Sequence, residues 1–259
     1  MMKAVAFWKN LALISLICVW LAPGPAMATN SLHEPDELLK SPTLDLGHAI
    51  YALDLYAAIL AKAQPPLAPI LTRLARTCFL IGELTVPSQK HKYYEKGKTY
   101  AEMLLKEQPT RVEGHYWLAL HLCGLADTGG ALVGRRLLPQ IMKELQQAES
   151  IDETYDQAGC HRVLGRIYFE APAWPFSIGD IQKSLKHLNR AVQLAPDNST
   201  NHLYLAETLM RLNRPEQARQ ELLRVLKCSH NALLAKGLED DRQQAKKLLA
   251  VIKASSEDN

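Results

Sequence analysis

Catalytic motifs are missing from this 259-residue sequence. It contains no HExxH zinc motif, no glycine-rich phosphate loop and no G-x-S-x-G nucleophile elbow, which argues against the common metalloprotease, nucleotide-binding and hydrolase sites. His115 and His121 are six residues apart, so they do not share a helix face and make no metal pair. We therefore predict that the chain is not an enzyme, with no catalytic residue, no metal and no cofactor.

Strong charge and plentiful aromatic side chains are also missing. The formal net charge is +3 and aromatic residues make up 7% of the chain. No basic block interleaved with aromatic residues occurs, so we expect no nucleic acid partner. Small apolar residues are abundant instead, as stacked helix pairs require.

Long apolar runs are absent except at the start of the chain. The apolar residues 11–22 follow two lysines and lead into the small-residue site Ala26-Met27-Ala28. This pattern predicts a secretory signal peptide over residues 1–28, cleaved after Ala28, and a periplasmic or secreted protein. An uncleaved anchor is the alternative, although the run is short for a membrane span. We predict no transmembrane span in the mature chain.

Cysteine pairs at metal or redox spacing are absent, since no CxxC occurs. The four cysteines after the predicted signal are Cys78, Cys123, Cys160 and Cys228. Cys78 and Cys123 occupy near-equivalent places on neighbouring predicted helices, so they are the pair best placed for a disulfide. Four buried free thiols are the alternative.

A repeated register is the main feature that is present. Small or apolar residues recur at steps of four, three and five residues in four stretches, which are Gly97-Ala101-Leu104-Pro109, Ile141-Leu145-Ala148-Glu153, Ser184-Leu188-Ala191-Pro196 and Ala218-Leu222-Val225-His230. Upstream of each, a Leu beside a small residue is followed one turn later by a large residue. Each unit therefore reads as a helix A, a turn and a helix B.

The spacing of these units predicts the fold class. The last step between units is 34 residues, which is the period of the tetratricopeptide (TPR) repeat. The two earlier steps are 44 and 43 residues, with the excess between helix A and helix B. We predict an all-α, TPR-like array of antiparallel helix pairs, an α-solenoid, with enlarged A–B turns in the first three units, most notably at Gly129-Gly130 and at residues 171–180.

The flanks of the array have a different composition. Residues 29–43 are polar and are expected to form a flexible lead, and residues 44–254 to form the repeat domain. Residues 239–254 read as a polar amphipathic helix that caps the open end of the array. Residues 255–259 are expected to be a disordered tail.

Several segments resemble a bacterial TPR-like family. Residues 162–168, 172–180, 191–196 and 204–207, together with His115-Tyr116-Trp117 and Gly179-Asp180, are similar to the T-component of tripartite ATP-independent periplasmic (TRAP) transporters. The resemblance covers about residues 65–230 and implies a periplasmic, non-catalytic, all-helical protein that binds a partner or a small, often hydrophobic, ligand. T-components are commonly lipid-anchored, whereas Cys18 here follows Ile17 and makes no lipobox.

The candidate binding residues are Tyr116, Trp117, Leu120, Arg162, Arg166, Trp174 and Phe176. On the second helix A, we expect Tyr116 to be exposed on the concave side with Leu120, and Trp117 to pack between units. On the third helix A, Arg162 and Arg166 either pair with Asp156 and Glu170 or bind a carboxylate or an acidic peptide.

The loop of residues 171–180 carries the remaining two candidates. Its aromatic side chains Trp174 and Phe176 either bury against the preceding unit as a plug or form a gate over the concave groove.

Two functions follow from these residues. The first is a non-catalytic TPR-repeat scaffold that binds a protein partner through its concave face. The second, implied by the resemblance, is a small-ligand accessory of a TRAP-type solute transporter that takes an apolar or carboxylate ligand.

Overall fold

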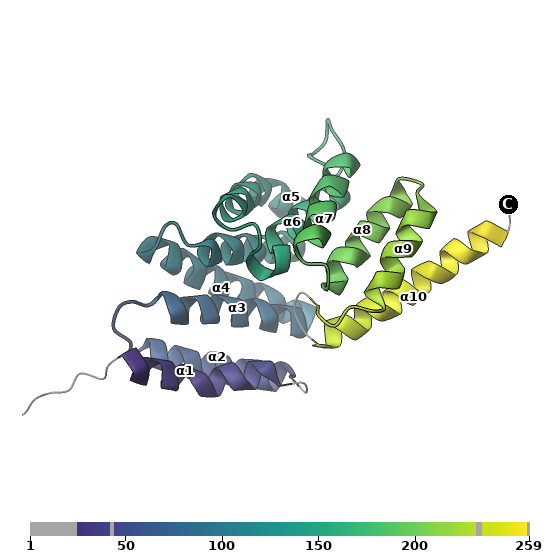
Figure 1. Cartoon of the computed structure of the whole chain (residues 1–259). Helices are drawn as coiled ribbons and strands as arrows, with labels where there is room; N and C mark the ends of the chain where they lie inside the picture. Colours follow the sequence, from purple (N-terminus) through teal and green to yellow (C-terminus); the bar gives the residue numbers. More distant parts are fainter. Residues whose placement is uncertain (1–24, 42–43, 232–234, 258–259) are drawn as a thin grey trace, which may run out of the picture.

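The chain folds into an array of antiparallel α-helices in the computed structural model, which describes residues 25–41, 44–231 and 235–257. Within these ranges the only β-structure is two isolated bridges. The helices are α1 (Pro25–Lys40), α2 (Leu46–Leu60), α3 (Ala68–Leu84), α4 (Pro87–Glu107), α5 (Val112–Ile151), α6 (Tyr155–Glu170), α7 (Ile181–Leu194), α8 (Ser199–Arg211), α9 (Pro215–Val225) and α10 (Ala235–Glu257). Figure 1 shows them stacked in chain order, which confirms the all-α repeat architecture.

The repeated register forms the packed face of each helix B. Its first three positions are buried in all four units: Gly97, Ala101, Leu104, Ile141, Leu145, Ala148, Ser184, Leu188, Ala191, Ala218, Leu222 and Val225. Small residues there let two helices approach closely. At Gly97, for example, a Cβ atom would come within 2.1 Å of the His121 ring, so only glycine fits.

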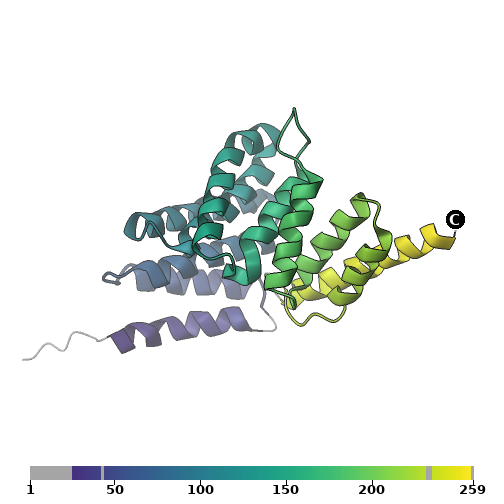
Figure 2. The ribbon, with the colours of Figure 1, turned by 45° about the horizontal axis from the view of Figure 1, so that its top comes forward.

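The extra residues of the first three units are placed in different ways. In the first unit they lengthen α4, which begins at Pro87 directly after α3. In the second unit one long helix, α5, bends back at Gly130, where φ is 77° and favours glycine. In the third unit they form the loop 171–180, which projects beyond the helices (Figure 2). Within residues 44–231, an enlarged A–B turn in the form of a loop is therefore present only in the third unit.

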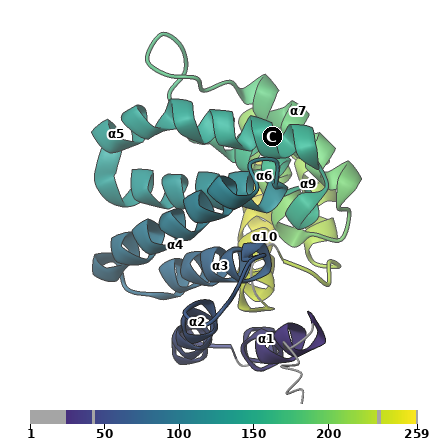
Figure 3. The ribbon, with the colours of Figure 1, turned by 90° about the vertical axis from the view of Figure 1, so that its left-hand side faces the viewer.

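The bend at Gly130 places the two halves of α5 side by side as a helix pair (Figure 3). The side chains of Trp117 and Leu120 in the first half share one hydrophobic cluster with Ile141 and Leu145 in the second half. The second unit thus keeps the A–B pairing that the register predicts, although no loop separates its two helices.

The first helix corrects the prediction of a flexible lead over residues 29–43. Residues 29–40 belong to α1, which packs beside α2 at the start of the array (Figure 1). The carboxylate of Asp36 accepts hydrogen bonds from the Arg73 guanidinium at 2.7 and 2.8 Å, and also from the Tyr56 hydroxyl. Because these partners lie on α2 and α3, local composition could not reveal them.

The other end of the array carries α10. This helix packs against α8 and α9, where its Ala245 and Ile252 are buried, as expected of a capping helix. It extends to Glu257, so residues 255–257 of the predicted disordered tail are helical, and the last two residues lie outside the described ranges. The predicted signal peptide also lies outside them, apart from residues 25–28. None of the described helices is long and apolar enough to cross a membrane.

All four cysteines described in the structure are free thiols, as in the alternative to a Cys78–Cys123 disulfide, and three of them are buried while Cys123 is partly buried. Cys78 is buried in the cluster shared by α2 and α3, whereas Cys123 packs beside Trp117 in a different cluster. Burial raises the pKa of both thiols to about 12, which keeps them protonated and unreactive at neutral pH.

Candidate binding groove and inter-helix joints

A cavity of about 990 Å³ lies along the first helices of the four units, and we call it the groove. Its walls come from α3, both halves of α5, α6, the loop 171–180, α8 and the start of α10. Most of the exposed lining is apolar and includes Phe79, Trp117, Leu120, Leu138, Ile141, Val163 and Ile167. Because helix A of every unit contributes, the repeat architecture itself creates this cavity.

The groove contains more carboxylates than cations. The acidic side chains among its lining residues are Glu83, Asp127, Asp156, Glu170, Asp240 and Asp241, against the three arginines Arg135, Arg162 and Arg166. An apolar floor beneath an acidic surround suits a partner with apolar and basic groups better than an acidic one.

Six of the seven candidate residues line the groove, namely Tyr116, Trp117, Leu120, Arg162, Arg166 and Phe176. Trp174, an exposed residue of the projecting loop, does not line the groove. Most of the predicted residues therefore share one cavity, although several of their side chains have other surroundings than the sequence suggested.

Tyr116 is buried, contrary to the expectation that it would be exposed. Only 1% of the residue is accessible, since it packs in a hydrophobic cluster, and its hydroxyl donates to the Asp156 carboxylate at 2.6 Å and accepts from Arg162 at 3.2 Å. Burial, together with the charge of Asp156, raises its pKa well above the usual value. Its neighbour Trp117 packs in the core as predicted and donates its indole N–H to the Tyr155 hydroxyl at 3.0 Å.

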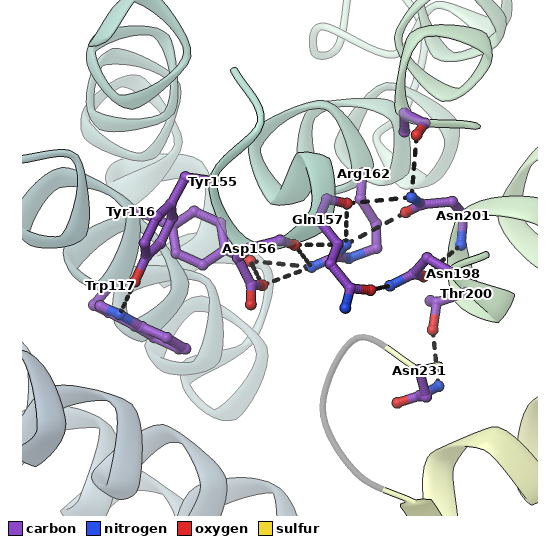
Figure 4. A network of polar contacts seen from close by, with 11 residues as sticks. Tyr116, Trp117, Tyr155, Asp156, Gln157, Arg162, Asn198, Thr200, Asn201 and Asn231 are labelled. Carbon is purple, nitrogen blue, oxygen red and sulfur yellow. Dashed lines mark hydrogen bonds and ion pairs between the residues drawn. The ribbon is translucent and has the colours of Figure 1, made fainter. Parts of the chain in front are cut away.

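Arg162 is the centre of a buried polar network (Figure 4). Its guanidinium donates to the Asp156 carboxylate at 2.8 Å and to the Asn201 side chain at 3.3 Å. Burial disfavours its charge, but the oxygens of Tyr116 and Asp156 outweigh that effect and raise its pKa. Arg162 is therefore a structural cation whose N–H groups donate to acceptors within the protein.

The same guanidinium stabilises an unusual start of α6. Asp156, Gln157 and Ala158 have φ values of 50°, 55° and 62°, a left-handed conformation that costs about 1–2 kcal/mol for each such residue. The carbonyl oxygens of Asp156 and Gln157 both accept from Arg162 at 3.2 Å. Residues 156–158 include no glycine that would predict a left-handed conformation before Gly159. The conformation is stabilised by Arg162, which lies further along α6.

Arg166 is also paired. It contacts Glu170 on its own helix and Glu207 on α8 at 2.5 Å each, and its guanidinium lies 4.6 Å from the centre of the Tyr204 ring. Both arginines thus follow the intrahelical pairing alternative, to Asp156 and to Glu170. This leaves little capacity for a carboxylate ligand.

The loop aromatics do not form a plug. Trp174 and Phe176 are 84% and 82% exposed. The loop closes through its own backbone, since the Gly179 amide donates to the Pro172 carbonyl and the Asp180 amide to the Tyr168 carbonyl, each at 2.9 Å. The aromatic side chains are therefore not needed to hold it, and Phe176 is placed at the rim of the groove.

Three histidines at one position of the repeat were missed by the sequence analysis as a set. His115, His161 and His202 each lie three residues before the Leu of the Leu–small pair on helix A. Reading the register three residues further upstream would have revealed them. Each of them contacts a side chain on helix B of its own unit, Glu144, His187 or Glu221, and we call these contacts the histidine joints.

Comparisons with known proteins agree with this architecture. A family profile described as "Regulator of microtubule dynamics protein 1-3" matches residues 32–175, and a tetratricopeptide repeat profile matches residues 178–252. No curated protein sequence matches the chain.

A solved structure gives the same fold. The crystal structure of TTC0263, a thermophilic TPR protein in Thermus thermophilus, is similar with a TM-score of 0.63 and 20% sequence identity, over 86% of this chain and 99% of that one. At this identity the likeness concerns the fold alone. Since the first profile covers more than half of the sequence, the chain is a TPR-type repeat protein that belongs to the family of regulator of microtubule dynamics proteins 1–3.

Proposed function

We propose that the chain is a non-catalytic scaffold, periplasmic or secreted, that binds a segment of a partner protein in the groove. The observation that carries the proposal is the groove itself, in which apolar side chains from all four units meet beneath an excess of carboxylates. A peptide segment with apolar anchors and a basic flank matches this surface in shape and charge.

The family adds support for a protein partner. Its description names the regulation of microtubule dynamics, and microtubules are assemblies of protein. We do not assign microtubules to this chain, because the proposed signal peptide would direct it to the periplasm or outside the cell. N-terminal sequencing of the mature protein should begin at Thr29, whereas a start at Met1 would overturn the proposed location.

Site-specific photo-crosslinking tests the groove directly. Leu138 lines the groove on the second half of α5, while Leu132 lies on the same half and is 85% exposed outside it. With a photoreactive amino acid at one position or the other in the full chain, we expect a single dominant protein adduct from Leu138 and none from Leu132.

A polar substitution in the groove supplies the matched loss of function. Leu138→Glu replaces an apolar contact of the groove with a charge that must be desolvated when a partner's apolar side chain binds, and it should weaken partner binding at least tenfold, whereas Leu132→Glu should leave it unchanged. Circular dichroism should show both variants folded, because neither leucine is in the core. Equal adducts from both positions, or equal binding by both variants, would contradict the proposal.

A small-ligand accessory of a TRAP-type transporter is the second candidate, and the size of the cavity favours it. Ligand pockets span about 300–1,000 Å³, and the volume of about 990 Å³ lies at the upper end of that range. Native mass spectrometry of protein purified without detergent distinguishes the two functions. A bound apolar molecule that is lost in Leu138→Glu would favour the ligand carrier.

A further inference from the structure

The histidine joints of the second and fourth units share one design. In the second unit, His115 Nδ1 lies 2.6 Å from the Glu144 carboxylate and its Nε2 lies 2.9 Å from the Pro109 carbonyl. In the fourth unit, His202 Nδ1 lies 2.6 Å from the Glu221 carboxylate and its Nε2 lies 2.8 Å from the Pro196 carbonyl. Each joint therefore links helix A to helix B through a histidine and a glutamate.

The third unit departs from this design at two positions. The residue equivalent to Glu144 and Glu221, three places after the first register residue, is His187. The register position that holds a proline in the other two joints holds Glu153. As a result His161 on α6 faces a second imidazole on α7, with their Nδ1 atoms 3.0 Å apart.

A carboxylate completes a cluster around these two nitrogen atoms. Glu149 Oε1, from the end of α5, lies 3.5 Å from His161 Nδ1. One ligand atom from each of Glu149, His161 and His187 lies within 4.8 Å of the other two. In a tetrahedral zinc site with bonds of about 2.0–2.1 Å, neighbouring ligand atoms are about 3.3 Å apart, and the measured separations bracket that value.

The second shell fixes which nitrogen of His161 is available. Its Nε2 lies 3.1 Å from the Glu153 carboxylate, which Arg190 Nε contacts at 3.0 Å. Glu153 lies closer to Nε2 than Glu149 lies to Nδ1, so a neutral His161 carries its proton on Nε2 and its lone pair on Nδ1, the nitrogen near His187 and Glu149. If His187 donates a proton from Nδ1, that proton can serve either His161 Nδ1 or the Glu149 carboxylate, but not both. A cation placed between His161, His187 and Glu149 would instead accept a lone pair from each of them.

We propose that Glu149, His161 and His187 bind a divalent transition-metal ion, with Zn²⁺ as the expected occupant. Two imidazoles and one carboxylate suit zinc, whereas magnesium and calcium prefer oxygen ligands alone. Tyr168 stacks on His187 with an interplanar angle of 17° and a centroid distance of 5.7 Å, which restrains the second ring. The ion ties the end of α5 to α6 and α7, with water in the remaining coordination position.

This site is separate from the groove and from the proposed function. None of its three ligands belongs to the residues that line the groove. His161 has 6% of its side chain exposed and Glu149 has 29%, so the pair is sheltered but reachable from solvent. Zinc binding and partner binding can therefore succeed or fail independently.

Isothermal titration of ZnCl₂ into the full chain, after treatment with EDTA and its removal, tests the proposal. We expect one Zn²⁺ per chain and a rise in the melting temperature, with Mg²⁺ giving neither. His187→Gln and Glu149→Gln should each weaken binding by more than about 100-fold, and Glu153→Gln, which alters only the second shell, by about 10–100-fold. Co²⁺ should give the visible absorption of a tetrahedral site, lost in His187→Gln.

Control variants separate a metal site from loss of fold. His91→Gln removes an exposed histidine on α4 and should bind Zn²⁺ as the original chain does. His187 is only partly buried, so His187→Gln should remain helical by circular dichroism. No Zn²⁺ binding by the original chain, or equal binding by His187→Gln, would overturn the proposal.

Discussion

The third and fourth units share one register but differ in how their two helices are joined. In the fourth unit, α8 and α9 are linked by a short turn and by the His202–Glu221 pair. In the third unit, α6 and α7 are linked by the loop 171–180 and by His161 facing His187. The paired helices of a unit can therefore be joined by a histidine–glutamate contact or by a histidine–histidine contact. The small register residues already fix the distance between the helices.

The two units also differ in what stabilises helix A. The α6 residue Arg162 is a buried cation, while its equivalent in α8, Leu203, is part of a hydrophobic cluster. One unit depends on a polar network that must be complete, and the other on apolar burial. This difference can be tested by making the same substitution at both positions.

The largest effect is expected from Arg162→Met. It removes the guanidinium from the Asp156 carboxylate, which keeps the Tyr116 hydroxyl as a donor, and from the left-handed carbonyls at the start of α6, and it should lower the free energy of unfolding by about 3–5 kcal/mol. The matched change Leu203→Met keeps apolar volume and should cost less than about 1.5 kcal/mol. Urea unfolding of both variants measures the difference, and similar losses would show that the network is not special.

His121 is a buried histidine without a carboxylate partner among the described residues, and it should make the stability of the protein depend on pH. Burial lowers the pKa of His121 to about 4 from 6.5, and its Nε2 donates to the Ala75 carbonyl at 3.0 Å. The unfolded chain therefore takes up a proton at higher pH than the folded one, so the stability that neutral His121 contributes is complete above pH 6.5 and is lost as pH falls toward 4.

The lowered pKa of His121 sets the expected change in the free energy of unfolding. Between pH 7 and pH 5 the contribution should fall by about 2 kcal/mol. His121→Gln, which does not titrate, should remove that part of the pH dependence. Unfolding curves at the two pH values, taken for both proteins, provide the check, and an unchanged pH slope in the variant would contradict a buried neutral His121.

The smallest effect concerns the two joints themselves. His202→Gln breaks the contact with Glu221 but leaves that carboxylate bonded to Arg224 at 2.8 Å, so it should cost about 1.5 kcal/mol. In the presence of EDTA, His187→Gln should cost less than about 1 kcal/mol, because that joint then lacks its cation. If the two variants melt at the same temperature, the joints do not differ in the way proposed.

The sequence predicted the parts of the fold that depend on local periodicity. The register positions are buried on helix B of each unit, and Asp180, directly before α7, accepts hydrogen bonds from the amides of Gln182 and Lys183 as a short-range cap. These features depend on neighbours within one or two turns of helix.

Features that depend on distant partners were not predictable in this way. The polar contact between α1 and the array is made by Arg73, which is 37 residues from Asp36, and the hydroxyl of buried Tyr116 bonds to Asp156, which is 40 residues away. His161 and His187 are separated by 26 residues and come together only when α6 and α7 pair. A single sequence shows such residues but not which of them will meet.

The bend at Gly130 has a consequence for engineering. Both halves of α5 are helical up to this one residue, so the chain reverses there without any slack to absorb added length. An inserted tag or domain at Gly130 would force the two halves out of the register that pairs His115 with Glu144. The exposed tip of the loop 171–180 carries no such constraint, which makes it the natural place to attach a fluorophore or an affinity handle.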